Sequence, residues 1–164
     1  MQTNYIKSKS IKEKVYKFVI HEDVFIITNI KNRSFNNCWL SIEPDGKITL
    51  NGSYEDGYAW DGCSPKVVFL DITWGTPDGK LDWDTEAPIT YYASLIHDVL
   101  YQFKGDIPIS KKEADILFLL NLRKTKFKLA GIYGFAVRVL GGLYGKWKTQ
   151  KSQSKINIEE FSWI

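Results

Sequence analysis

The sequence has no uninterrupted apolar run of the roughly 18 residues that a membrane-spanning helix needs, so no transmembrane segment is expected. It opens on polar residues and lysines rather than on a basic and then apolar leader, and we expect no signal peptide. It also lacks a phosphate-binding loop, a dinucleotide-binding fingerprint and a Gly-x-Ser-x-Gly elbow. The best-marked nucleotide-binding and serine-hydrolase classes are therefore not indicated.

Cysteine and histidine are both scarce. Cys38 and Cys63 are the two cysteines, and their spacing matches no zinc motif. Their redox state stays open, with the reduced thiols of a cytosolic protein as the default. The two histidines are His21 and His97, so any chemistry that needs an imidazole has only these positions.

What the sequence does have is enough apolar material for one domain and an uneven distribution of charge. The 164 residues are 44% hydrophobic and 15% aromatic. Residues 55–98 hold nine acids and two lysines, whereas residues 116–158 hold nine basic residues and no acid. We expect the basic region to meet an anionic membrane surface or another protein's acidic patch, or to be a solvated basic surface. Nucleic acid is not the expected partner, because no recognisable reading module accompanies the charge.

The order of the predicted elements is strands first and helices afterwards, which indicates an α+β fold. Runs rich in β-branched and aromatic residues predict strands at 15–20, 24–28, 38–42, 47–50, 67–70 and 72–74. Pro44-Asp45-Gly46 predicts the turn of an antiparallel hairpin. Residues 52–65 are dense in turn-forming residues. We expect a polar arm at 1–13, one α+β domain at 14–148, and a C-terminal tail at 149–164 that docks on a partner or on the domain.

Three helices are expected in the C-terminal part, at about 89–103, 111–124 and 128–147, where the hydrophobic period changes to 3.6. Ser110 followed by Glu113 is the pattern of a capping box at the start of the second helix. The short connection between the first two helices predicts that they pack as an antiparallel pair.

The candidate site lies on this helix pair. His97 and Tyr101 are one turn apart on one helix face, and an antiparallel second helix brings Asp115 towards them. A carboxylate bonded to one imidazole nitrogen leaves the other nitrogen free as a general base. Asp98 would then point elsewhere and be available as a hard-oxygen ligand for a cation. The competing interpretation is a buried polar network that holds the two helices together.

Other arrangements of the same residue types are weaker candidates. The loop Asp61-Gly62-Cys63-Ser64-Pro65 is either the lip of the His97 site or an Asp-Gly turn closed by proline. Cys63 as a nucleophile is less favoured than Cys63 as a small buried residue. His21 with His97, Asp98 and Asp115 follows the ligand order of HD-type phosphohydrolases, but those enzymes are all-helical and His21 lies between strand-like runs.

Four motifs in this order resemble an uncharacterised family of phage and prophage proteins, the domain-of-unknown-function family numbered 1353. The motifs are Tyr58-Ala59-Trp60-Asp61-Gly62-Cys63-Ser64-Pro65, Ala93-x-x-x-His97-Asp98-x-x-Tyr101, Ser110-x-x-x-Ala114-Asp115 and Tyr133-x-x-x-Val137-Arg138-x-x-Gly141. The resemblance covers about residues 58–142. It implies a setting in the bacterial host cytoplasm or in a virion, with other virion proteins as partners.

The His97-Asp98-x-x-Tyr101 helix and the Ala114-Asp115 pair are also similar to parts of A2-type phospholipases, especially the parvoviral ones. This resemblance implies His97 as the base that activates water, Asp115 as its orienting partner and Tyr101 as a brace for Asp115. It also implies calcium, with Asp98 and the Asp61 loop as its ligands. The sequence departs from those enzymes in lacking a glycine-rich calcium loop just before the helix and a disulfide framework.

Two hypotheses about function follow. The first is a calcium-assisted hydrolase of lipid esters that acts during phage entry or exit. The second is a non-enzymatic virion or assembly component, in which the His97, Tyr101 and Asp115 cluster is structural.

Overall fold

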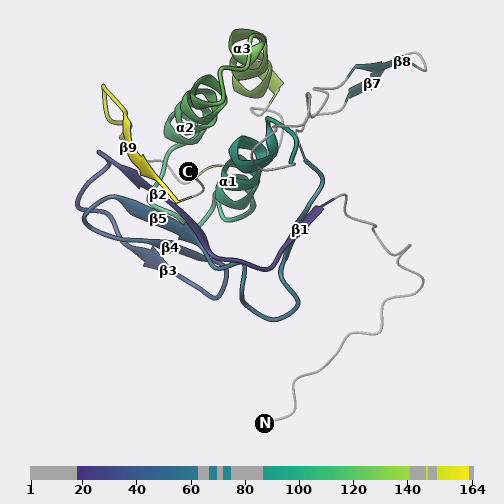
Figure 1. Cartoon of the computed structure of the whole chain (residues 1–164). Coiled ribbons are helices and arrows are strands. Elements are labelled where there is room, and N and C mark those ends of the chain that lie inside the picture. The colour runs from purple at the N-terminus through teal and green to yellow at the C-terminus, as the bar shows by residue number, and fades with distance from the viewer. Residues whose placement is uncertain are drawn as a thin grey trace.

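The computed structural model describes residues 18–62, 67–69, 72–74, 87–140, 147 and 151–162. Antiparallel strands come first and helices follow, which confirms the predicted α+β class (Figure 1). The N-terminal arm predicted at 1–13 lies outside the described residues.

The main sheet has five strands in the order β3-β4-β5-β2-β9, and every neighbouring pair is antiparallel. The strands are β2 Val24–Thr28, β3 Phe35–Asn36, β4 Leu40–Ile42, β5 Lys47–Leu50 and β9 Ile158–Phe161. The predicted β4–β5 hairpin is present, and Gly46 in its turn has a φ of 92°, which favours glycine. Buried and half-buried residues alternate along β2 and β5, so one face of the sheet carries the core.

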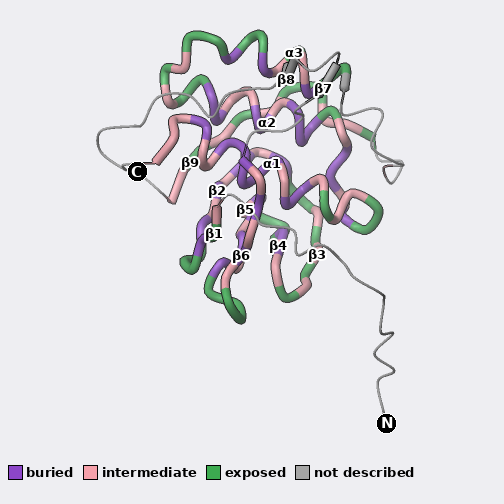
Figure 2. The backbone as a smooth tube through the Cα atoms, turned by 90° about the vertical axis from the view of Figure 1, so that its right-hand side faces the viewer, coloured by how far each residue is buried: buried purple, intermediate pink, exposed green. Residues whose placement is uncertain are grey.

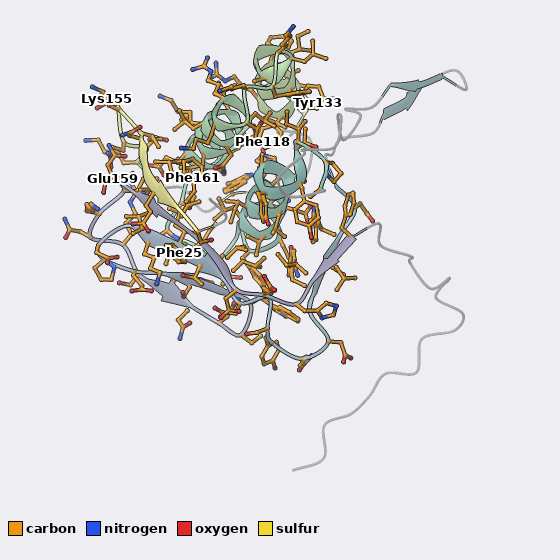
Figure 3. All side chains as sticks on the ribbon, viewed as in Figure 1. Phe25, Phe118, Tyr133, Lys155, Glu159 and Phe161 are labelled. Atoms are coloured by element: carbon orange, nitrogen blue, oxygen red, sulfur yellow. The ribbon has the colours of Figure 1, made fainter. Side chains whose placement is uncertain are left out.

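Strand β9 comes from the segment that the sequence suggested as a tail. It pairs with β2, with Ile26 opposite Phe161, and the two strands lie side by side where Phe25 and Phe161 are labelled (Figure 3). The Phe25 amide also donates to Ser162 Oγ at 2.7 Å. Residues 158–161 complete an edge of the main sheet, so this part of the tail docks on the domain, which is one of the two alternatives expected for it.

Two smaller sheets accompany the main one. β1 Phe18–Ile20 pairs with β6 Tyr58–Trp60, and β7 Val67–Phe69 pairs with β8 Ile72–Trp74. β6 falls within residues 52–65, which are dense in turn-forming residues and were not among the predicted strands. It is a strand because Trp60 is fully buried, between the rings of Phe18 and Tyr91.

The helices are α1 Tyr91–Gln102, α2 Lys111–Lys124 and α3 Ala130–Leu140. The predicted capping box is present, since Ser110 Oγ accepts from the Glu113 amide and Glu113 accepts from the Ser110 amide. Residues 141–146 of the predicted third helix lie outside the described residues. Among the helices that the structure describes, none is both long and apolar enough to cross a bilayer.

α1 and α2 both contribute to the core shared with the sheet, and α3 packs on α2 at the end of the molecule away from the sheet (Figure 1). One core cluster joins sheet residues such as Ile26 and Leu50 to Leu95 and Leu100 of α1. A second cluster joins α1, α2 and α3, and its members are Ala93, Phe118, Leu122, Ala130, Tyr133 and Val137. α1 and α2 run in opposite directions, because Tyr101 meets Asp115 while His97, one turn earlier, meets Phe118 further along α2.

A buried ion pair between Arg33 and Glu113 connects the start of α2 to the rest of the molecule. Glu113 is fully buried, and its two carboxylate oxygens accept from Nη1 and Nη2 of Arg33 at 2.7 and 2.9 Å. The same carboxylate accepts from the Ser110 amide and hydroxyl and from the Gln153 amide. Arg33 in turn donates to the carbonyl of Pro108. One carboxylate thus joins the β2–β3 loop, the helix N-terminus and the C-terminal segment.

Removing the arginine should be much more destabilising than breaking an exposed ion pair. We expect Arg33→Met to lower the free energy of unfolding by about 3–5 kcal/mol, because it leaves the Glu113 charge buried without its partner. Lys31→Met is the matched control: its pair with Glu159 is about half exposed on both sides and should contribute at most about 1 kcal/mol. Urea unfolding of the three proteins measures both values. Equal losses in the two variants would contradict the assigned role of Arg33.

Candidate functional site

His97 lies on the face of α1 that packs against α2. The residue is 9% exposed, and its ring packs between Tyr101, with ring centroids 4.2 Å apart, and Phe118, at 4.8 Å. Nε2 of His97 is 3.2 Å from Oδ1 of Asp115. The two aromatic neighbours and this contact fix the orientation of the imidazole ring.

Asp115 is the centre of the cluster. Its Oδ1 also accepts from the hydroxyl of Tyr101 at 2.6 Å, and its Oδ2 accepts from Nζ of Lys111 at 2.6 Å. The three residues that the sequence proposed as catalytic, His97, Tyr101 and Asp115, therefore lie in mutual contact. Their catalytic role stays a prediction.

The surroundings of Asp115 keep its carboxylate charged. Burial on its own raises the pKa of Asp115, but hydrogen bonds from His97, Lys111 and Tyr101 outweigh it, so the net shift of the pKa is downward. The pKa of Tyr101 is raised, first by burial and then by its hydrogen bond to the Asp115 carboxylate and the repulsion from that charge. Tyr101 therefore remains a donor to Asp115.

Lys111 was not among the residues proposed from the sequence. Besides Asp115, its Nζ donates to the carbonyls of Val137 at 3.3 Å and Arg138 at 3.0 Å, which lie near the end of α3. Lys111 and Asp115 are four residues apart on one helix, the spacing of an intrahelical ion pair, so this contact could have been predicted from the sequence. The contacts of Lys111 with the carbonyls of α3 could not have been predicted from the sequence.

Asp98 and Asp61 are the two proposed metal ligands, and Asp98 does not face Asp115. Asp98 follows His97 directly, so it points about 100° further round the helix. Its Oδ2 lies 3.3 Å from the hydroxyl of Tyr58 on β6, which donates mainly to Gln102 Oε1 at 2.7 Å. Asp61 is half-buried directly after β6. Among the described residues, no group of three or more His, Cys, Asp and Glu side chains could hold a metal.

The remaining histidine and the two cysteines are the other chemistry-bearing candidates. His21 is exposed in the turn after β1, so it does not join His97. Cys38 is a free, exposed thiol. Cys63, Ser64 and Pro65 lie outside the described residues.

An open cleft adjoins the cluster between the start of α2 and the end of α3. Its volume is about 480 Å³, and the described residues that line it are Lys111, Lys112, Asp115 and Arg138. Lys112 and Arg138 are exposed. The cleft therefore presents positive charge beside the carboxylate that contacts His97.

Comparison with protein-family models, with curated proteins and with solved structures finds no match to this chain. The resemblances to the phage family and to the A2-type phospholipases thus remain expectations drawn from the sequence.

Removing the Tyr101 hydroxyl should raise the pKa of Asp115. Tyr101→Phe keeps the ring and deletes one of the hydrogen bonds that favour the ionised carboxylate. We expect a loss of about 1.5–3 kcal/mol in the free energy of unfolding. Carboxyl ¹³C chemical shifts of Asp115, followed against pH, measure the first effect. Tyr54→Phe is the matched control on an exposed phenol, and an identical Asp115 titration in both variants would contradict the prediction.

Acid should weaken the fold through the same group. Because the pKa of Asp115 is lower in the folded protein than its ordinary value of 3.8, its stabilisation is present above about pH 4 and lost as pH falls further. Asp115→Asn should be less stable at neutral pH and should lose less stability between about pH 4 and pH 2. Urea unfolding of both proteins across this range tests the difference, and parallel curves would contradict it.

Proposed function

We propose that the protein is a hydrolase of carboxylic esters, with phospholipid-like esters as its substrate class and His97 as its general base. The observation that carries the proposal is the double contact of Asp115 Oδ1 with Nε2 of His97 and the hydroxyl of Tyr101. A carboxylate against Nε2 favours the tautomer with the proton on that nitrogen and leaves Nδ1 as the acceptor. Nδ1 has no hydrogen bond to a described residue.

In the proposed reaction, Nδ1 of His97 takes a proton from a water molecule as the water oxygen bonds to the ester carbonyl carbon. Collapse of the tetrahedral intermediate breaks the bond to the leaving oxygen, and His97 returns the proton to it. The products are a carboxylic acid and an alcohol. Asp115 stabilises the imidazolium that forms between these steps, and Tyr101 and Lys111 hold Asp115 in place.

Calcium is the cofactor that the phospholipase resemblance implies, with Asp98 and Asp61 as its ligands. Calcium takes six to eight oxygen ligands. The described residues provide no group of acidic side chains large enough for a metal, so they do not by themselves fit this ion and no step is assigned to it. The proposed setting is a phage or its bacterial host, with an anionic membrane or other virion proteins as partners.

A second function is favoured by a different observation. Asp115 is bonded through both oxygens, and Lys111 extends these bonds to carbonyl groups of α3, so one carboxylate connects all three helices. A buried hydrogen-bonded network centred on one carboxylate holds helices in a unique arrangement. In this alternative the protein is a non-enzymatic virion or assembly component, and His97 stabilises the packing of its helices.

The first test is hydrolysis of phospholipid vesicles, with calcium and with a chelator. We expect His97→Gln to lower turnover by about 10²–10⁴-fold, the usual contribution of a general base. His21→Gln is the matched control, because His21 is the other histidine and is exposed. Its turnover should equal that of the wild type. Thermal unfolding shows whether the His97 variant is folded under the assay conditions.

Equal turnover by the wild type and a folded His97→Gln variant would contradict the hydrolase proposal. No hydrolysis by the wild type in either condition, together with a large loss of stability in His97→Gln and Asp115→Asn, would support the structural alternative.

A further inference from the structure

The outer face of α3 is apolar although it is exposed. Leu129, directly before the helix, and Ile132, Phe135 and Val139 within it are 45, 64, 69 and 53% exposed. They recur every three or four residues, a spacing that aligns them along one side of the helix. Apart from these four, the large hydrophobic side chains exposed in the described part of the chain are only Val19 and Tyr54. We call Leu129, Ile132, Phe135 and Val139 the α3 stripe.

The opposite side of α3 already has its packing partners. Ala130, Tyr133 and Val137 are buried against Phe118 and Leu122 of α2, and Figure 3 shows Phe118 and Tyr133 on these neighbouring helices. α3 is therefore apolar on both sides and not only on the side that serves the core. It lies at the edge of the molecule farthest from the main sheet in both views (Figures 1 and 2).

Positive charge accompanies the stripe along the chain. Arg123, Lys126, Lys128 and Arg138 are exposed and close to it in sequence, and the sequence from 116 to 158 contains no acidic residue. Lys124 is exposed as well, but its Nζ lies over the Phe161 ring on β9. An apolar stripe with lysine and arginine at its borders is the pattern of a helix that lies in the headgroup region of an anionic bilayer. Long basic side chains can rest their stems on the apolar face and keep their charges at the lipid phosphates.

The described part of α3 is too short to cross a bilayer. Its eleven residues span about 16 Å of helix, whereas a hydrocarbon core is about 30 Å thick. An acidic protein patch would match the cations, but it would leave a wide apolar stripe to be covered. An anionic lipid surface satisfies both features at once.

The cleft between α2 and α3 continues this surface towards the candidate site. Arg138 follows the stripe residue Phe135 by one turn and, with Lys112, lines the cleft that also reaches Asp115. The charge of Lys111 is already offset by Asp115, which leaves Lys112 and Arg138 as the cations available to a lipid phosphate. A headgroup held there would bring its ester groups to the side of the molecule that carries Asp115.

We propose that the α3 stripe and its bordering cations dock the protein on an anionic phospholipid bilayer, with one lipid phosphate in the cleft between Lys112 and Arg138. Docking by itself does not depend on catalysis. The delivery of an ester towards His97 is the only part that rests on the proposed function.

Co-sedimentation of the full chain with vesicles tests the docking. The vesicles are phosphatidylcholine alone or phosphatidylcholine with about 30% phosphatidylglycerol, an anionic fraction set so that surface charge dominates recruitment. We expect binding to the anionic vesicles, weaker binding at high salt, and little binding to phosphatidylcholine. Ile132→Ser with Phe135→Ser should weaken binding by at least about tenfold, because two side chains lose their burial in lipid.

Val19→Ser is the matched control, because Val19 is 45% exposed on β1, away from α3, and its variant should bind like the wild type. Arg138→Gln should reduce the preference for phosphatidylglycerol severalfold. Equal binding by the stripe variant and the wild type would overturn the proposal. Sedimentation velocity provides a second test. If the wild type is a dimer and the stripe variant is a monomer, the stripe binds a second copy of the chain and the membrane proposal is overturned.

Failure of docking and failure of catalysis are separable. Binding that is retained by His97→Gln, with no hydrolysis by any variant, would leave the docking surface standing and remove the hydrolase. Hydrolysis of a monomeric short-chain ester by a protein that does not bind vesicles would support the hydrolase and overturn the docking surface.

Discussion

The arrangement of the helices depends on the buried carboxylate of Glu113. It accepts from Arg33, Ser110 and Gln153, which belong to segments far apart in the chain. Burial raises the pKa of Glu113, but the hydrogen bonds from Arg33, Gln153 and Ser110 outweigh burial, so the net shift of the pKa is downward. The carboxylate therefore stays charged inside the protein. An apolar residue at this position would leave the Arg33 charge and the amides of Ser110 and Gln153 without this acceptor. The ion pair therefore specifies where α2 begins and how it meets the sheet.

This constraint reaches the candidate site through α2 itself. Asp115 follows Glu113 by two residues, so it points to a different side of the helix, towards α1 and α3. Because the first turn of α2 is held by Glu113, Asp115 can stand in one fixed position against Nε2 of His97. A general base and a structural hydrogen bond both require this fixed position. The two functions differ in whether Nδ1 of His97 takes up a proton during turnover.

Local patterns in the sequence predicted the local parts of this structure. The Ser110–Glu113 capping box, the bounds of α2 and the hairpin at Gly46 each depend on residues only a few positions apart. The contact of His97 with Asp115 was also predictable, because helical spacing and a short connection define it. The contacts of Arg33 and Gln153 with Glu113 were not predictable, because no local pattern in the sequence pairs these residues. Strand β9 was missed for the same reason: Glu159 and Glu160 are exposed, and only its pairing with β2 makes the segment a strand.

Lys111 connects the proposed docking helix to the candidate site. It shares its three N–H groups between Asp115 and the carbonyls of Val137 and Arg138, so its position depends on α2 and α3 together. A shift of α3 against a bilayer would change the bond that Lys111 gives to Asp115, and with it the field that His97 experiences. In the proposed docking, a membrane contact at α3 would therefore act on the imidazole of α1 without touching it. In a purely structural network, the same link would make the membrane surface a determinant of how firmly the three helices hold together.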